Sequence, residues 1–309
     1  MRLSTSVVFA AGVCWGSITL SAQALATPPG HELSVGAAHY NYVEPGVQSI
    51  SIHGPKLKAE YTGTMSLSRR GRWFAQANVS ATLGSVSYDG FCAPWFITPN
   101  SASPNGYLLD LGDASPCSEK GDSDWYVEGR AVLGKDLVGG SWALSPYTGV
   151  GARHLSNGTS GIKGYRTDNY LYLPFGAAVR TEIASRHVLS VNVEYDRLVR
   201  GWQKTRDSAF GGGEVDATPT APAFTIDGFT DTAFDQHGGW ALRASARYQL
   251  TPHWSLEPYY IHWSVEDSPA NAETVTFTVN NVAAHEHLGF YEPHNTTNEV
   301  GVRLGLRFK

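Results

Sequence analysis

The sequence predicts an all-β fold, a transmembrane antiparallel up-and-down β-barrel of ten strands, from three observations. Apolar residues make up 42% of the chain, yet after residue 26 they form no run of about 20, the length that a membrane-spanning helix needs. Instead they alternate with polar residues in short segments, and a period of two belongs to strands. The connections between these segments are short and long in turn, as in barrels that cross a membrane.

Residues 1–26 predict an export signal that is cleaved from the protein. Arg2 supplies the positive start, Val7 to Leu20 form an apolar core, and Ala24-Leu25-Ala26 supplies the small residues of a cleavage site. The core is too short for a membrane anchor, so we expect one barrel domain over residues 27–309.

Five expected strands lie in the first half of the chain, at residues 33–43, 57–67, 73–83, 125–133 and 142–150. The clearest is 73–83, where every second residue from Trp73 to Leu83 is apolar and most residues between them are polar. Residues 33–43 alternate less regularly, and they complete the count of ten strands. One face of each strand therefore suits lipid and the other suits a polar interior.

The other five expected strands are residues 171–177, 189–195, 240–248, 254–265 and 300–308. A further segment, residues 273–281, also alternates. It raises the count to twelve if it is one arm of a hairpin in the ring, or it extends a strand above the membrane. We expect ten.

Short connections at 68–72, 134–141, 181–186 and 251–253 would lie at one rim of such a barrel. Long connections, expected to be the extracellular loops, are residues 44–56, 84–124, 155–165, 201–238 and 266–297. A soluble β-sandwich or a lipocalin-like barrel also alternates, but tryptophans at both ends of the strands favour a membrane barrel with two interfacial girdles. These are Trp73, Trp142 and Trp254 at the short-turn end and Trp125 and Trp240 at the long-loop end.

Charged residues of both signs share the face opposite the apolar one, which predicts a charged lumen. The expected lumen residues are Lys58, Glu60, Glu128, Arg130, Arg153, Glu194, Asp196, Arg243, Arg247, Glu257, Arg303 and Arg307. A barrel of about eight strands is filled by side chains, so a lumen of ten strands is narrow. Because unpaired buried charges are unfavourable, we expect them to pair and to close the lumen, with a narrow diffusion pore as the alternative.

The net charge argues against one class of partner, and the cysteine content predicts one covalent cross-link. The formal charge of −5 argues against a nucleic-acid partner, which a basic protein would bind. Cleavage of the signal removes Cys14 and leaves Cys92 and Cys117, which in an exported protein predict a disulfide, here within the second long loop.

Two residue pairs, one of two aspartates and one of an aspartate and a histidine, end long loops and form the one constellation with catalytic chemistry. Asp122 and Asp124 share the parity of the inward Glu128, and Asp235 and His237 share that of Arg243, so we expect all four at the barrel mouth. A histidine oriented by an aspartate, opposite two carboxylates, is able to activate water. The pattern Asp-x-Asp-Trp with Asp-x-His resembles the omptin family of outer-membrane proteases. That resemblance implies that Asp122 and Asp124 position water and that His237, oriented by Asp235, acts as base.

A second resemblance covers more of the chain. Residues 40–46 (YNYVEPG), 145–153 (SPYTGVGAR), 170–174 (YLYLP) and 194–196 (EYD) are similar to segments of little-characterised outer-membrane barrels of Gram-negative bacteria. It implies the bacterial outer membrane as the location, with lipid, lipopolysaccharide and the barrel-assembly machinery as partners and no established reaction.

The sequence indicates no cofactor and no metal centre. His285 and His287 would share one side of a strand, but the sequence shows no third ligand near them. The sequence favours a structural or surface-interaction protein of the outer membrane over an enzyme, with an extracellular ligand that the sequence does not identify. The alternatives are an omptin-like endoprotease and a narrow pore.

Overall fold

The computed structural model describes residues 25–46, 49–68, 72–158, 165–184, 187–209 and 212–308. All of the expected signal peptide except Leu25 and Ala26 lies outside the described residues, so its cleavage stays a prediction. The described residues contain one short 3₁₀ turn, η1 (Asp207–Ala209), and no helix that is long and apolar enough to cross a membrane.

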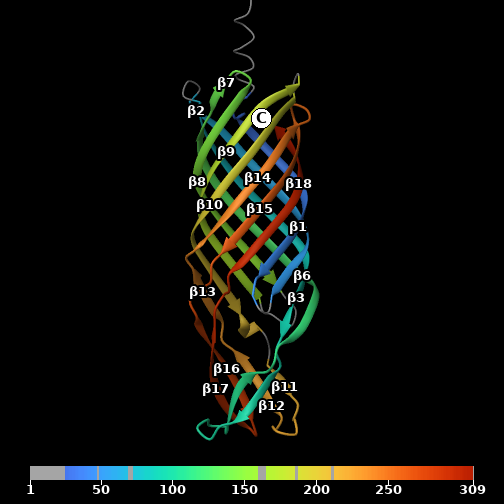
Figure 1. Ribbon diagram of the computed structural model, residues 1–309, viewed down its shortest axis with the longest axis vertical. Helices are drawn as coiled ribbons and strands as arrows, with labels where there is room; N and C mark the ends of the chain where they lie inside the picture. The colour runs from blue at the N-terminus through green and yellow to red at the C-terminus, as the bar shows by residue number, and fades with distance from the viewer. Residues whose placement is uncertain are drawn as a thin grey trace, which may run out of the picture.

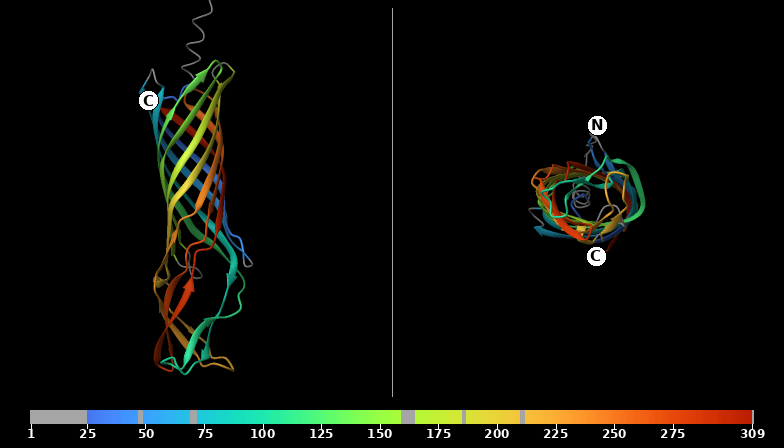
Figure 2. Two further views of the ribbon diagram at one scale, coloured as in Figure 1. Left: turned by 60° about the vertical axis from the view of Figure 1, so that its left-hand side comes forward. Right: turned by 90° about the horizontal axis from the view of Figure 1, so that it is seen from below.

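Ten antiparallel strands close into a barrel, which confirms the predicted fold class and strand number (Figures 1 and 2). In order around the ring they are β1 (Gly30–Glu44), β2 (Ile50–Ser68), β3 (Trp73–Cys92), β6 (Ser115–Lys135), β8 (Trp142–Gly158), β9 (Tyr165–Ala184), β10 (His187–Arg206), β14 (Gly239–Gln249), β15 (Trp254–Val265) and β18 (Asn295–Phe308). The ring closes where β18 pairs with β1, from His31 opposite Phe308 to Val43 opposite Thr296. Closure leaves no strand edge in hydrocarbon, where its backbone groups would lack hydrogen-bond partners.

Several barrel strands are longer than the sequence predicted. β3 has 20 residues and β6 has 21, whereas a strand crosses a bilayer in about 9 to 11. Much of the expected loops at 44–56, 84–124 and 155–165 is therefore strand. The reason is that the β3–β6 ladder continues from Gly84 opposite Asp124 to Cys92 opposite Ser115, with one bulge between Val86 and Ser87.

The remaining long connections fold into a second β-structure, which we call the head. Its four-stranded sheet consists of β11 (Gly213–Val215), β12 (Phe224–Phe229), β16 (Asn271–Val279) and β17 (Val282–Phe290), and a hairpin of β4 (Trp95–Pro99) and β5 (Tyr107–Leu111) packs against it. Their shared apolar core contains Ile97, Leu109, Phe224, Ile226, Val275, Phe277, Val279 and Ala284. Figure 1 shows the head at the end of the barrel opposite the C-terminus.

The alternating segment 273–281 belongs to this head and not to the ring. It forms β16 and the start of a tight hairpin to β17, with Asn280 and Asn281 at φ 51° and 64°. Positive φ at both central residues is the geometry of a type I′ turn, which asparagine tolerates. Two short strands, β7 (Leu137–Gly139) and β13 (Thr232–Gln236), pair with β8 and β10 beside the ring.

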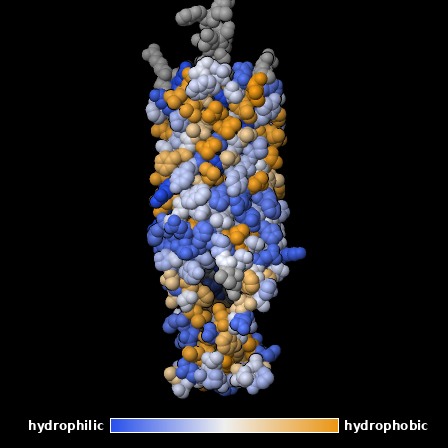
Figure 3. Space-filling model, in the orientation of Figure 1, coloured by the Kyte–Doolittle hydropathy of each residue, from blue (hydrophilic) through white to orange (hydrophobic). Residues whose placement is uncertain are grey.

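The outer wall of the barrel is apolar, as the strand pattern predicted. Figure 3 shows apolar side chains spread over the wall toward the C-terminal end and hydrophilic side chains where the wall approaches the head. The five tryptophans of the two expected girdles are all exposed on the outside. The wall therefore presents a lipid-facing surface bounded by aromatic side chains.

Candidate functional site

The lumen holds the charged side chains that the sequence placed there, and they contact one another across the barrel. Of the twelve expected lumen residues, eleven take part in ion pairs, and Arg153 stacks over the ring of Tyr126 at 4.0 Å. Side chains from opposite walls meet because a ring of ten strands is narrow. These contacts form successive layers along the barrel axis.

The central layer is organised by Arg243 of β14. Its Nη1 donates to Glu128 Oε2 at 3.0 Å, its Nη2 donates to Glu128 Oε1, and its Nε donates to Asp196 Oδ2 at 2.6 Å. Tyr172 also donates to Glu128 Oε1 at 2.5 Å. Arg130 pairs with Glu194, which lies 3.4 Å from Arg243 Nε. These ion pairs and hydrogen bonds thus connect strands β6, β10 and β14 across the lumen at one level.

A second layer lies toward the short-turn rim and is built around Arg303 of β18. Its Nη1 donates to Glu60 at 2.5 Å and its Nη2 to Glu257 at 2.9 Å. Arg247 lies 3.1 Å from Glu257 and also pairs with Glu32. Arg307 donates to the other oxygen of Glu32 at 3.3 Å. A cavity of about 170 Å³ adjoins these two layers and is lined mainly by polar side chains.

Toward the head, Glu299 and Asp124 accept hydrogen bonds from buried cations and hydroxyls. Tyr126 and Tyr259 donate to Glu299 at 2.7 and 2.9 Å, and Lys58 Nζ lies 3.4 Å from it. Lys56 donates to Asp124 at 2.5 Å, and its ammonium lies 3.3 Å from the centre of the Tyr40 ring. The ammonium of Lys56 is therefore buried between the carboxylate of Asp124 and the aromatic face of Tyr40.

Sequence reasoning missed several partners in this network. Glu32, Lys56 and Glu299 all face the lumen and pair there. Their parity matches that of the residues that were identified, but each of the three lies one residue before the range assigned to its strand. Extending each strand by its parity, as the ladders do, would have found them.

The four candidate catalytic residues are divided between two sides of the wall. Asp122 and Asp124 face inward and are buried, as expected. Asp235 and His237 are exposed on the outside, and Asp235 accepts from Arg200 Nη2 at 2.8 Å. The expectation that all four point into the mouth is therefore corrected. Only the two aspartates of β6 lie inside it.

The backbone at Gly238 and Gly239 explains this difference. The parity argument assumed one continuous strand from Asp235 to Arg243, but β13 ends at Gln236 and β14 begins at Gly239, whose φ is 151°. Both strands pair with β10, β13 at 201–205 and β14 at 189–197, and β10 itself has an irregularity between Leu198 and Arg200. The break shifts the alternation by one residue, so Gln236 points inward in place of Asp235 and His237.

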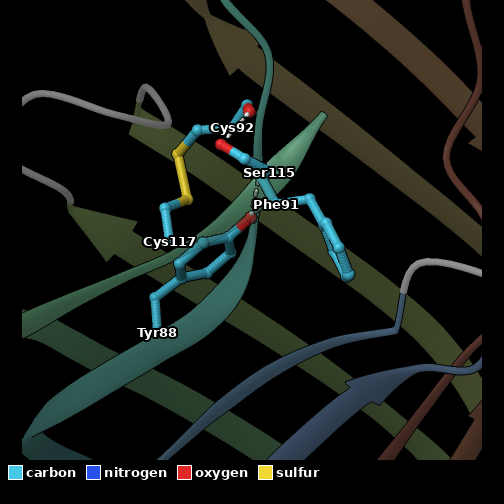
Figure 4. Close-up of a disulfide and its surroundings, with 5 residues drawn as sticks. All are labelled: Tyr88, Phe91, Cys92, Ser115 and Cys117. Carbon is cyan, nitrogen blue, oxygen red and sulfur yellow. Dashed lines mark hydrogen bonds between the residues drawn. A yellow bond between two sulfur atoms is a disulfide. The ribbon is translucent and has the colours of Figure 1, made fainter. Parts of the chain in front are cut away.

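Cys92 and Cys117 form a disulfide, as the sequence predicted, with their Cα atoms 5.8 Å apart. Figure 4 shows it across the outer part of the β3–β6 hairpin, next to Tyr88 and Ser115. Ser115 donates to the carbonyl of Cys92 at 3.5 Å. The bond closes the segment that carries the β4–β5 hairpin of the head.

Two carboxyl groups with raised pKa values are Glu273 of the head and Asp207 directly after β10. Glu273 of β16 lies on the same face as Val275 and Phe277 and is 7% exposed. Burial, together with the nearby charge of Asp207, raises the pKa of Glu273 to about 7. Burial also raises the pKa of Asp207, which accepts from Thr232 Oγ1 at 3.3 Å.

Known structures with similar folds are outer-membrane barrels. The outer membrane protease OmpT from Escherichia coli aligns over 91% of this chain and 98% of its own, with 10% identity and a TM-score of 0.52. The fold is that of an outer-membrane β-barrel. The translocator domain of the autotransporter NalP from Neisseria meningitidis aligns over 94% of this chain and 93% of its own, with 10% identity and a TM-score of 0.36. An outer membrane channel from Pseudomonas putida F1 aligns over 96% of this chain and its full length, with 11% identity and a TM-score of 0.34.

No protein-family model and no curated protein matches the sequence. The likeness to OmpT at this identity concerns the fold alone.

Proposed function

We propose that the protein is an integral outer-membrane barrel with a closed lumen, which acts as a structural or surface-interaction protein through its head. The observation that carries the closed lumen is the Arg243 layer, in which one guanidinium is held by carboxylates from two other strands. An ion crossing this layer would have to separate buried, hydrogen-bonded charges, which is strongly unfavourable.

The head supports the surface-interaction part of the proposal. Its strands come from three separate connections of the barrel, yet they share one apolar core. Loops that fold on their own core present a fixed surface at the membrane exterior, and binding residues are often carried on such loops above a rigid scaffold. A plain diffusion barrel does not need this structure.

Planar-bilayer recording tests the closed lumen. The refolded wild-type protein should give no stable single-channel steps, and neither should Arg200→Ala, which changes an exposed ion pair on the outer wall. Removing both arginine layers with Arg243→Ala and Arg303→Ala should open measurable steps. Stable steps from the wild type would contradict the closed lumen and support the narrow pore.

An omptin-like endoprotease is the second candidate, favoured by the inward Asp122 and Asp124 and the fold shared with OmpT. The outward position of Asp235 and His237 disfavours it, because a base must reach the water that it deprotonates. Incubation of the protein, refolded with lipopolysaccharide, with a mixed peptide library separates the two. Cleavage that is lost in His237→Ala would establish the protease, whereas no cleavage is expected from the proposed function.

A further inference from the structure

Arg153 of β8 is buried without an acceptor for its charge. Its side chain is 5% exposed, its Nε has no hydrogen-bond partner, and among the described residues no carboxylate lies within ion-pair distance of it. Its guanidinium stacks on the face of the Tyr126 ring, at 4.0 Å. The other buried arginines of the lumen, such as Arg243, all have carboxylate partners. Such a guanidinium has donors free for an acceptor from outside the chain.

This arginine lines a small cavity at the end of the lumen that faces the head. The cavity measures about 30 Å³ and lies among β1, β8, β9 and the segment that precedes β18. Asp168 and Glu292 provide carboxylates on its wall, and Tyr40, Tyr42 and Tyr170 provide aromatic faces. A space of this size holds about two water-sized groups.

Asp124 and Arg166, which also line the cavity, are already engaged within the protein. Asp124 is bound by Lys56 at 2.5 Å and by Asn157 Nδ2 at 3.0 Å. Arg166 lies 3.3 Å from Glu44 and 3.9 Å from Glu292. Hence Arg166 is shared between two carboxylates, and Arg153 is the cation at the cavity with which a bound anion would pair.

Carboxylates and a free arginine at one cavity define a site of mixed charge. An anion alone would be held by Arg153 but would approach Asp168 and Glu292, and a cation alone would approach Arg153. A molecule with both charges satisfies both sides. We propose that the cavity binds the head group of a small zwitterion, a free α-amino acid, with its carboxylate on Arg153 and its ammonium toward Asp168 and Glu292.

The aromatic walls are consistent with this ligand class. A tyrosine face attracts an ammonium, as the contact of Lys56 with Tyr40, one of the residues that line the cavity, shows. Tyr42 donates to Glu292 at 3.1 Å and so holds that carboxylate in place. The cavity has space for about two water-sized groups, so it would enclose only part of the head group, and the Cα atom and the side chain would lie outside it.

Isothermal titration calorimetry of the refolded full-length protein in detergent tests this site with three probes: L-alanine, acetate and methylammonium. L-alanine should bind, and acetate and methylammonium should each bind at least tenfold more weakly. Arg153→Gln and Asp168→Asn should each weaken L-alanine binding at least tenfold, whereas Arg200→Gln, on the outer wall, should leave it unchanged.

Several results would overturn the inference. One is that the wild type does not bind L-alanine. Another is that it binds acetate as well as L-alanine, which indicates a simple anion site. The third is that Arg153→Gln binds L-alanine as the wild type does. Folding of each variant is checked by its resistance to unfolding in sodium dodecyl sulfate. If Arg153→Gln does not fold, Asp168→Asn decides, because loss of its L-alanine binding supports the site and unchanged binding contradicts it.

Discussion

Arg243 and Glu128 meet across the lumen through two parallel hydrogen bonds, although they are 115 residues apart in the sequence. Arg243 stands on β14 and Glu128 on β6, so the pair joins two walls that share no backbone hydrogen bond. A planar guanidinium matches a carboxylate in this two-pronged way, which gives the pair both strength and a defined geometry. The pair is the centre of the Arg243 layer of the lumen.

Arg243→Ala should lower the free energy of unfolding by about 3 to 5 kcal/mol, because it leaves Glu128 and Asp196 buried without their cation. Urea unfolding of the protein in lipid vesicles measures this loss. Arg200→Ala is the control, since its exposed pair with Asp235 should contribute about 1 kcal/mol or less. Equal losses in the two variants would argue against a structural role for the central layer.

A charge introduced on the outer wall should lower the free energy of unfolding much more where lipid surrounds it than where water does. Val302→Arg, on the outward face of β18, should destabilise the protein by about 2 to 4 kcal/mol if the residue lies near the bilayer centre. Val282→Arg, at an equally exposed valine of the head, should change stability by about 0.5 kcal/mol or less. Unfolding in vesicles measures both, and a similar cost at both positions would contradict the placement of the bilayer.

Removal of the disulfide should loosen the head and leave the barrel intact. Cys92 and Cys117 are separated by 25 residues, and closing a loop of that length stabilises a fold by about 3 kcal/mol in the chain-entropy description. Cys92→Ser with Cys117→Ser should therefore speed proteolysis between β4 and β5 while the barrel stays resistant to unfolding in detergent. Cleavage at an unchanged rate would show that the apolar core of the head keeps this hairpin folded without the disulfide.

Head stability should fall as the pH rises toward neutrality. The pKa of Glu273 is about 7 in the fold and lower in the unfolded chain, so the folded head binds the extra proton between these values. The stabilisation by protonated Glu273 is complete below about pH 4 and is lost as the pH rises through 7. Over this range the equilibrium constant for opening of the head changes by at most about tenfold per pH unit. Hydrogen exchange of β16 amides from pH 5 to 8 measures the effect. Glu273→Gln should remove most of it, and an unchanged pH profile in this variant would assign it to Asp207 or another group.

The predicted cleavage after Ala26 would give Thr27 a free ammonium beside a buried carboxylate. Thr27 N and Oγ1 already lie 2.9 and 2.6 Å from the two oxygens of Asp136, which Ser145 and Arg180 also contact. In the cleaved protein, Asp136→Asn should lower the free energy of unfolding by about 2 kcal/mol, and acetylation of Thr27 should lower it by part of that amount. Mass spectrometry of the mature protein checks the site, since a different N-terminus would remove the basis of the prediction.

The fold was predictable because its signal is local. In every expected strand, from 33–43 to 300–308, the period of two that defines a strand also assigns each side chain to lipid or lumen. The disulfide followed from cysteine number and export alone. The head was not predicted, because its sheet joins β12 with β16, and that pairing depends on contacts between distant loops.

The sequence by itself thus determined ten strands, their lipid faces and a charged lumen, because alternation needs only neighbouring residues. Only the tertiary structure decided which charges meet and on which side of the wall rim residues point. Two glycines between β13 and β14 turn Asp235 and His237 outward, and the narrow ring leaves Arg153 without the carboxylate that every other lumen arginine identified from the sequence receives. Both outcomes depend on backbone breaks and cross-lumen distances, which arise only when all ten strands are closed into one ring.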